Sequence, residues 1–388
     1  MRLAIVGPAP PWRGGIALHT AEMASAARAR GHEVLVVSFR RLYPGWLFPG
    51  TSQLEPGAAP PSADDRDARP LLDSLDPLSW RRAGAAILDF EPDLVVFQRW
   101  HPFFQAAFAT VARIARRSGA LVAWMVHNAE PHEGAPFPRA LATLGMQSGD
   151  SFLVHAASEA DRLAAIGVTV PVTVLRHPVP KRVVVRRERA EARRGLSVPE
   201  EETLFLFFGY VRPYKGVDLL LDALSRLEAA GPPWRAIVAG EWYVDRASAD
   251  ARVARPPLAG RVHIVDRYVP DDEAAALFAA CDVVVLPYRD ATQSGVVPLA
   301  WAHGRPVVTT AVGGLPDAVE DGATGLLVAP GDPAALAEAL ERIRRGFPFD
   351  PVRISSAVTR ADWAGFIAAM ESLVATRPRP VDRPSGKI

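Results

Sequence analysis

The sequence predicts an α/β protein of two similar domains, each built on a mostly parallel sheet, with a cleft between them. Short apolar segments alternate with longer amphipathic segments of helical length, which is typical of strands joined by crossover helices. This alternation stops at a basic, polar stretch and then starts again, so two sheets are expected. The length of 388 residues agrees, because single hydrophobic cores stop growing at roughly 250–300 residues.

The first half begins with an apolar strand, a glycine pair and an amphipathic helix. We predict strands at residues 2–6, 33–38, 93–97, 120–126, 151–155 and 172–175. We predict helices at residues 16–30, 77–89 and 104–118. Proline, glycine and charged residues dominate residues 43–70, which are therefore predicted to form a long loop.

The second half opens with a continuous apolar segment at residues 203–208, as expected of a strand buried on both faces. Further strands are predicted at residues 235–239, 262–265, 282–286 and 306–310. Asp332 and Pro333 form an N-cap and N1 pair, which predicts the start of a helix. Apolar residues at helical spacing predict a helix after the first strand, and they are Val217, Leu220, Leu221, Leu224 and Leu227.

These patterns place an N-terminal domain at residues 1–180, a linker at 181–202 and a C-terminal domain at residues 203–358. Residues 181–195 hold seven cations and two acids, and we interpret them as a solvated segment with a short helix. A membrane or partner patch is the less favoured interpretation. The proline-rich residues 377–388 are predicted to be a disordered tail.

Composition excludes several classes of protein. The net charge of +1 argues against a nucleic-acid binder, which needs an excess of cations to neutralise phosphates. The single cysteine, Cys281, fits a reducing compartment and reads as an inert core thiol. The N-terminus lacks the features of a signal peptide, and no segment is long and apolar enough to span a membrane. A cytoplasmic location is therefore expected.

Ligands of open α/β sheets bind beyond the carboxyl ends of the strands, so the residues there are the candidate site. After the first strand, Gly14 and Gly15 begin a helix, where backbone amides attract phosphate. After the strand ending at residue 126 comes His127, followed by Asn128, the only asparagine of the chain. His132 and Glu133 follow; their spacing does not match a helical zinc motif, so we predict polar contacts to a substrate and no metal.

Two cations follow the first strand of the second half. Arg212 and Lys215 come directly before an amphipathic helix, whose positive dipole end reinforces them. Only three lysines occur among 44 basic residues, which suggests that position 215 requires one. Such a cluster suits an anionic leaving group such as a diphosphate. Residues 292–295, before another helix, offer further amides for an anion or a hydroxyl.

Taken together, several segments resemble the retaining glycosyltransferases of family 4, which have the GT-B fold of two Rossmann-like domains. The resemblance extends to about residue 375, and it is carried by GGIALHTAEMASAARARGHEV, FFGYVRPYKGVDLLLDAL, AACDVVVLPY and AHGRPVVTTAVGGLPDAVEDGATGLLV. It implies a nucleotide-diphosphate sugar as co-substrate, no metal or other cofactor, and an acceptor bound by the first half. It also implies a last helix, at about residues 359–376, that returns to the first domain.

The resemblance also implies roles for individual residues. His127, Arg212 and Lys215 are the expected catalytic residues, with His127 touching the sugar and Lys215 pairing with the diphosphate. Asn128, His132 and Glu133 are expected on the acceptor side. The expected donor-binding residues are Gly14, Gly15, Gly209, Glu241, Asp290, Thr292, Gln293, Ser294, Gly295 and Val296.

The sequence departs from the family at three positions. Tyr210 stands where the family usually has arginine, and Ala291 and Leu299 stand where it usually has two glutamates that meet the sugar and the ribose. The segment TQSGV, residues 292–296, looks like a recognised variant of this region. The departures leave the donor open, and they leave two alternatives: a nucleotide-sugar epimerase of the same fold, or a non-catalytic nucleotide-sugar-binding protein.

The acceptor is expected to be a glycan or a lipid-linked sugar, as in polysaccharide or glycolipid synthesis. A basic and aromatic loop in the first half suggests weak peripheral contact with a membrane. Its residues are Arg40, Arg41, Tyr43, Trp46, Leu47 and Phe48.

Overall fold

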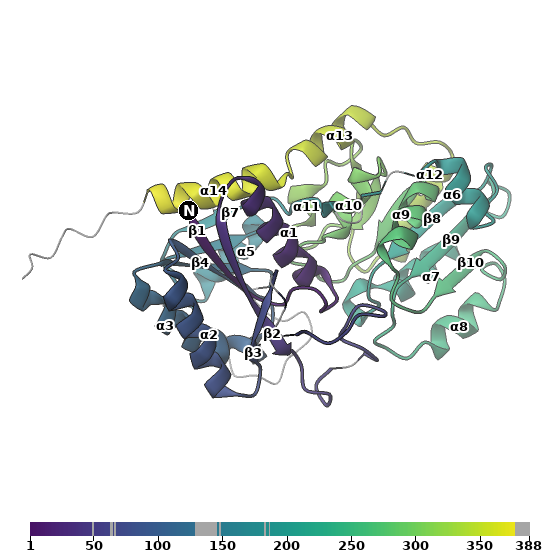
Figure 1. Cartoon of the computed structure of the whole chain (residues 1–388). Coiled ribbons are helices and arrows are strands. Elements are labelled where there is room, and N and C mark those ends of the chain that lie inside the picture. The colour runs from purple at the N-terminus through teal and green to yellow at the C-terminus, as the bar shows by residue number, and fades with distance from the viewer. Residues whose placement is uncertain are drawn as a thin grey trace, which may run out of the picture.

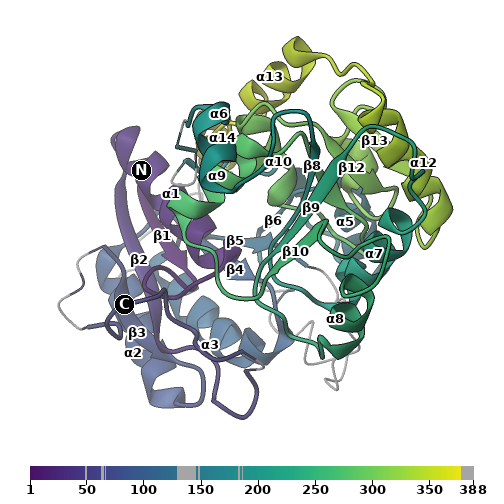
Figure 2. The same ribbon diagram turned by 90° about the vertical axis from the view of Figure 1, so that its right-hand side faces the viewer.

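The computed structural model describes residues 1–48, 50–62, 65, 67–128, 146, 149–181, 184–185 and 187–376. Within these ranges the chain forms two fully parallel sheets, one in each half (Figure 1). Figure 2 shows the strands of the second half in front of those of the first. The predicted α/β fold of two parallel-sheet halves is confirmed.

The first sheet has seven strands in the order β3-β2-β1-β4-β5-β6-β7. Its strands are β1 Arg2–Val6, β2 Glu33–Arg41, β3 Arg69–Asp73, β4 Leu94–Arg99, β5 Leu121–Val126, β6 Ser151–Val154 and β7 Val172–Val174. The helices of this half are α1 Gly15–Ala29, α2 Pro77–Phe90, α3 Gln105–Ala115 and α5 Ala157–Ala165, with short 3₁₀ turns η1 Pro102–Phe104 and η2 Arg116–Ser118.

The second sheet has six strands in the order β10-β9-β8-β11-β12-β13. They are β8 Thr203–Phe208, β9 Trp234–Ala239, β10 Val262–Val265, β11 Val283–Leu286, β12 Val307–Thr310 and β13 Gly325–Val328. The accompanying elements are α6 Arg189–Gly195, η5 Pro213–Lys215, α7 Val217–Leu224, α8 Ala247–Val253, α9 Asp271–Ala280, α10 Val296–Ala302, α11 Leu315–Ala318, α12 Pro333–Arg344 and α13 Pro351–Thr359.

Alternating side chains of β1 show how each sheet is covered. Leu3 and Ile5 face a core that they share with α1 and with the last helix, α14 (Trp363–Ala375). Ala4 and Val6 face the opposite core, which includes side chains of α2 and α3. This alternation follows from the two-residue period of a strand, and it explains why the strand is apolar throughout.

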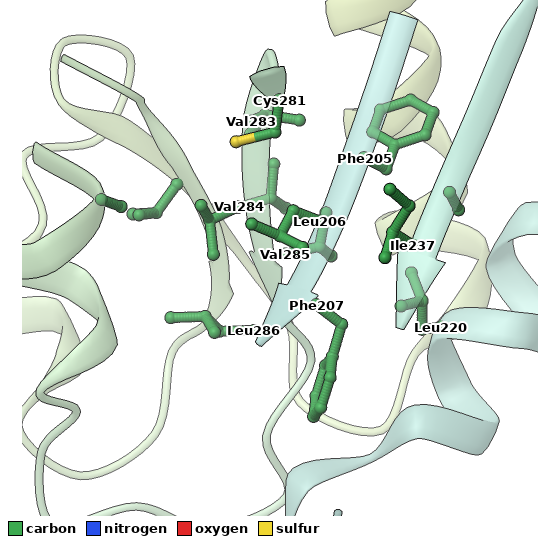
Figure 3. Packing of buried hydrophobic residues seen from close by; sticks show 14 of the residues in the cluster. Phe205, Leu206, Phe207, Leu220, Ile237, Cys281, Val283, Val284, Val285 and Leu286 are labelled. Atoms are coloured by element: carbon green, nitrogen blue, oxygen red, sulfur yellow. The ribbon is translucent and has the colours of Figure 1, made fainter. Parts of the chain in front are cut away.

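The core of the second half is formed largely by β8 and β11. Figure 3 shows Phe205, Leu206 and Phe207 of β8 beside the valines of β11. Cys281 lies in the same core, where burial raises the pKa of its thiol to about 12. The expectation of a buried, unreactive thiol is confirmed.

Two strands were not predicted, and both lie at sheet edges. β3 lies partly within the segment predicted as a loop, and its Pro70 argued against a strand. An edge strand tolerates proline because its outer side forms no backbone hydrogen bonds with another strand, so the missing N–H of proline costs little there. β13 pairs only with β12 and contains Gly325, where a Cβ would come within 2.4 Å of the Val307 carbonyl oxygen.

The short helix predicted in the linker is present as α6, and it is solvated on one side only, because Ala192 and Arg193 are buried. Arg193 is fully buried, and its guanidinium donates to Asp282 and to the carbonyls of Ala280 and Glu202. The cations of this helix therefore tie it to the second core.

Two chain segments cross between the halves, and they are bonded to each other. The first follows β7, and the second joins α13 to α14. The amide of Val179 donates to the Ala361 carbonyl at 3.0 Å, and the Trp363 indole donates to the Val179 carbonyl at 3.1 Å. α14 then lies along the first half (Figure 1), where Arg30 pairs with Glu371 at 2.7 Å.

Candidate active site

A cavity of about 360 Å³ lies between the two halves. It is lined by the segments that follow β1 and β5 in the first half, and β8, β9 and β11 in the second. In each sheet the first strand, β1 or β8, is interior, and later strands are added first on one side of it and then on the other. The cavity lies beyond the carboxyl ends of these strands, where the order of the strands reverses. It gathers most of the predicted site: Gly14, Gly15, His127, Asn128, Gly209, Lys215, Glu241, Thr292, Gln293, Ser294, Gly295 and Val296.

The structure does not bring Arg212 and Asp290 into this cavity. Both line a separate cavity of about 560 Å³ on the second half. Arg212 is extended just before the η5 turn that carries Lys215, and its guanidinium lies 4.8 Å from the ring centre of Tyr243. Asp290 faces Arg162 at 3.9 Å. His132 and Glu133 lie outside the described residues.

Lys215 is a half-buried cation that makes no ion pair within the described part of the chain. Its ammonium lies 5.4 Å from the ring centre of Tyr288, and a Cβ on Gly209 would come within 3.1 Å of Nζ. Desolvation, followed by the charge of Arg212, lowers the pKa of Lys215 to about 8. Lys215 is therefore a desolvated cation held beside the cavity.

The start of α1 faces the same cavity. Gly14 precedes the helix with φ of 111°, a conformation that L side chains rarely adopt, and it provides no side-chain cap. The first amides of this 15-residue helix are therefore left without a capping side chain. Together with Lys215 across the cavity, they form a site suited to an anion.

Four histidines form a cluster on the first half: the buried His19 of α1, His127 after β5 and His155 after β6, and the half-buried His177 after β7. The rings of His19 and His127 are 4.9 Å apart and nearly perpendicular. Burial, followed by the charge of His177, lowers the pKa of His127 to about 3. Burial also lowers the pKa of His177 to about 4, and those of His19 and His155 well below their ordinary value. The cluster is therefore neutral at physiological pH.

Thr292 joins the two halves. Its hydroxyl lies 2.8 Å from Oδ1 of Asn128 and 3.0 Å from the carbonyl oxygen of His127. The guanidinium of Arg99, at the end of β4, also donates to the carbonyl of Asn128. The rare asparagine thus has a structural partner in the other half as well as a place in the cavity wall.

A second bridge between the halves is a buried ion pair. Arg13 Nη2 lies 2.6 Å from Glu241 Oε2, with side-chain exposures of 5% and 10%. The amide and hydroxyl of Thr51 also donate to Glu241. Glu241 was predicted to bind the donor, but its carboxylate is already engaged by groups of the first half.

The two positions where the family usually has glutamate are apolar in the structure as well as in the sequence. Ala291 and Leu299 are both buried, and Leu299 lines the cavity. This part of the wall therefore offers no carboxylate to a sugar or ribose hydroxyl.

Sequence reasoning missed three residues that the structure places at the site. His19 lies in the amphipathic helix four residues after Gly15, and this spacing on the inward helix face was the available signal. Gln98 lies at the end of β4, like other candidate residues at strand ends. Arg13 precedes the glycine pair, but its partner is far away in the sequence.

The loop at residues 40–48 is packed more than its sequence suggested. Arg40 pairs with Asp76, and Arg41 with Asp73. Tyr43 packs against Phe48 and other rings of the first half, which leaves Trp46, at 77% exposure, as the one strongly exposed aromatic of this loop.

Searches for two other kinds of site give negative results within the described ranges. No group of three or more His, Cys, Asp or Glu is arranged there to hold a metal ion. No helix of the described chain has both the length and the apolar character of a membrane span.

Comparison with known proteins agrees with this geometry. A model described as Glycosyltransferase Family 4 matches residues 13–182, and one described as Glycosyl transferases group 1 matches residues 202–345. Among solved structures, the sucrose-phosphate synthase of Thermosynechococcus elongatus superposes with a TM-score of 0.71 at 18% identity, covering 96% of this chain and 98% of that one. Anabaena HepE, solved with UDP and glucose, gives 0.73 at 17% identity, covering 97% and 100%.

The fold is thus that of the GT-B glycosyltransferases. The two family models match nearly the whole of both halves, and the chain belongs to the family 4 glycosyltransferases.

Curated relatives match part of the chain. The D-inositol 3-phosphate glycosyltransferases of Stackebrandtia nassauensis and Actinosynnema mirum are each 32% identical, over 239 and 257 residues. These matches cover 56% and 62% of this chain and 52% and 61% of the relatives. The chain therefore spans little more than half the length of the curated relatives it matches.

Proposed function

We propose that this protein transfers a sugar from a nucleotide-diphosphate sugar to a hydroxyl of an acceptor, with retention of configuration and without a metal ion. The donor would lie in the 360 Å³ cavity, with its diphosphate between Lys215 and the start of α1. The sugar would lie toward His127 and Asn128 on the first half.

The observation that carries this proposal is the unpaired ammonium of Lys215. A half-buried cation without a partner costs free energy in the empty protein, which indicates that an anion completes the site. The opposite wall presents the first amides of α1, which have no capping side chain, and Glu22 and Glu55 of the same half also line the cavity. A leaving diphosphate is the anion that a sugar-transfer reaction supplies, and stabilising its charge lowers the barrier.

The chemistry asks for charge stabilisation and positioning rather than a protein base. The bond between the anomeric carbon and the diphosphate oxygen breaks, and the acceptor oxygen bonds to that carbon on the same face. The acceptor proton passes to the departing phosphate oxygen. Neutral His127 is too weak a base for this step, with a pKa of about 3, so its role is contact with the sugar.

The apolar residues at positions 291 and 299 do not select a particular base or sugar of the donor. Structural neighbours were solved with UDP, with UDP and glucose, and with ADP and acarbose. We propose a nucleotide-diphosphate sugar of this kind, held without the usual carboxylates because Ala291 and Leu299 replace them.

We further propose a glycan or lipid-linked acceptor, approached from the cytoplasm. Peripheral membrane contact remains a weaker part of the proposal. It rests on Trp46, because the arginines of that loop are already paired with Asp73 and Asp76.

A screen of nucleotide sugars tests the proposal directly. Thermal shift with UDP-, GDP-, ADP- and dTDP-sugars identifies the donor, and release of free nucleotide diphosphate with and without acceptor measures turnover. Acceptor-dependent release that persists in EDTA supports the transferase. Isomerised sugar without an acceptor indicates the epimerase, and tight binding without turnover indicates the binding protein.

A further inference from the structure

Gln98 makes the one direct side-chain hydrogen bond to His127 among the described residues. Gln98 is the penultimate residue of the buried β4 strand and is fully buried itself. Its Oε1 lies 2.6 Å from Nε2 of His127, which follows the neighbouring strand β5. The amide therefore meets the imidazole on the side of the ring that faces the core of the first half.

The other side of the amide fixes which of its two atoms faces the histidine. Nε2 of Gln98 lies 3.7 Å from the sulfur of Met23. A thioether accepts hydrogen bonds weakly and donates none. The NH₂ group of Gln98 can therefore donate to the sulfur, whereas the amide oxygen would find no donor in the same place. The Gln98 side chain also interacts with the ring of His19 and, against the larger effect of burial, raises its pKa, as an oxygen that accepts from the ring does. This arrangement directs Oε1 toward His127.

An oxygen facing Nε2 requires a proton on that nitrogen. The ring is buried among three other imidazoles and is neutral, so it carries one proton only. If that proton is on Nε2, Nδ1 has a free lone pair. His127 lines the cavity, and Nδ1 makes no hydrogen bond to another described residue.

We propose that Gln98 is a positioning residue that locks His127 as the Nε2-protonated tautomer, so that Nδ1 accepts a hydrogen bond from a substrate hydroxyl. This inference rests on the proposed function, because it identifies the group that His127 recognises. The hydroxyl must act as donor, so the site selects a sugar with a free hydroxyl at that position over its deoxy, fluoro or O-methyl analogue.

The tautomer is measured directly by NMR. The protein is labelled with ¹⁵N-histidine, and His127→Gln assigns the His127 resonances among nine histidines. Long-range ¹H–¹⁵N correlation of the full-length protein should show Nε2 protonated and Nδ1 unprotonated. Gln98→Met, which fills a similar volume without an acceptor oxygen, should give a mixture of tautomers or the reverse one. Gln98→Glu, which keeps an oxygen at that place, should retain the wild-type tautomer.

Kinetics separate positioning from folding. Gln98→Met should lower kcat about tenfold while leaving the affinity for UDP, which has no sugar, within about twofold. A general loss of structure would lower both. Gln53→Met is the matched control, because its amide bonds the backbone of Tyr43 outside the cavity; it should change neither the His127 tautomer nor kcat.

Two results would overturn the inference: a wild-type His127 protonated on Nδ1, or an unchanged tautomer in Gln98→Met. Failure of the proposed function looks different. In that case the tautomer and its dependence on Gln98 are as predicted, but no nucleotide sugar is turned over by the wild-type protein.

Discussion

The two walls of the cavity show opposite consequences of the same physical effect. Burial lowers the pKa of His127 on the first wall to about 3, and that of Lys215 on the second to about 8. Imidazole ordinarily titrates near pH 6.5, so its downward shift removes the charge at neutral pH. Lysine starts near 10.4, so a comparable shift leaves it cationic. The imidazole of His127 is therefore neutral and suited to a hydroxyl, whereas the ammonium of Lys215 is charged and suited to a diphosphate.

The largest expected effect removes the charged wall. Lys215→Met should lower kcat by a factor of about 10²–10³, as expected when one preorganised charge-stabilising group is lost. Turnover with the donor identified by the screen measures it. Lys181→Met, at an exposed lysine, is the control and should leave turnover unchanged.

The same substitution should stabilise the empty protein. The pKa of Lys215 is lower in the folded protein than in the unfolded chain. The free-energy cost of burying its charge is therefore complete below pH 8 and disappears above about pH 10.4. At pH 7, Lys215→Met should raise the free energy of unfolding by on the order of 1–3 kcal/mol, measured by urea denaturation. A less stable, fully active variant would mean that Lys215 is an ordinary structural residue.

The pH dependence of donor binding separates the two walls. The cationic form of Lys215 binds the diphosphate, so affinity for the nucleotide sugar identified by the screen, whose phosphates do not titrate in this range, should fall about tenfold per pH unit above pH 8. Between pH 5 and 7.5 it should be nearly flat, because the histidines are already neutral. Calorimetry across pH measures this, with Lys215→Met expected to lose the alkaline fall. A step near pH 6.5 would mean that a cavity histidine titrates normally.

The ion pair that bridges the walls should couple them. A double-mutant cycle of Arg13→Met and Glu241→Gln should give a coupling of about 1–3 kcal/mol in the free energy of unfolding, because the two opposite charges are buried and lie 2.6 Å apart. Additive single effects would show that the halves do not depend on this pair.

The smallest expected effect concerns Thr292. Thr292→Val removes a hydroxyl bonded across the halves and should cost about 0.5–1.5 kcal/mol. Small-angle scattering should show a larger radius of gyration, since the cleft opens more often. Thr309→Val, whose hydroxyl bonds within the second half, should cost a similar free energy without the change in size.

Local pattern predicted most of the fold and part of the site. Continuous apolar strands and helical periodicity depend on neighbours in the sequence, so β1, β8 and α1 were found close to their observed bounds. β3 and β13 were missed because an edge strand needs less apolar sequence, and only its partner strand shows that it pairs.

The site was predicted where chain position alone determines it. His127 and Lys215 follow strands directly, and the strand ends gather them. The partners that set their chemistry come from elsewhere: Tyr288 beside Lys215, and His177 beside His127. Arg212 was predicted beside Lys215, and its charge does reach that ammonium, but its side chain lines the neighbouring cavity because residue 212 is extended just before the turn.

The paired crossings at Val179 and Ala361 have a mechanical consequence. A single connecting strand would let the halves swivel and tilt about several axes. Two connecting segments that are hydrogen-bonded side by side leave mainly one rotation of the halves, about an axis through both segments. Each opening then follows the same arc, and each closing returns Thr292 to Asn128 and Arg13 to Glu241 in the same register. The paired crossings therefore favour one alignment of the two walls over the many that a single connection would allow.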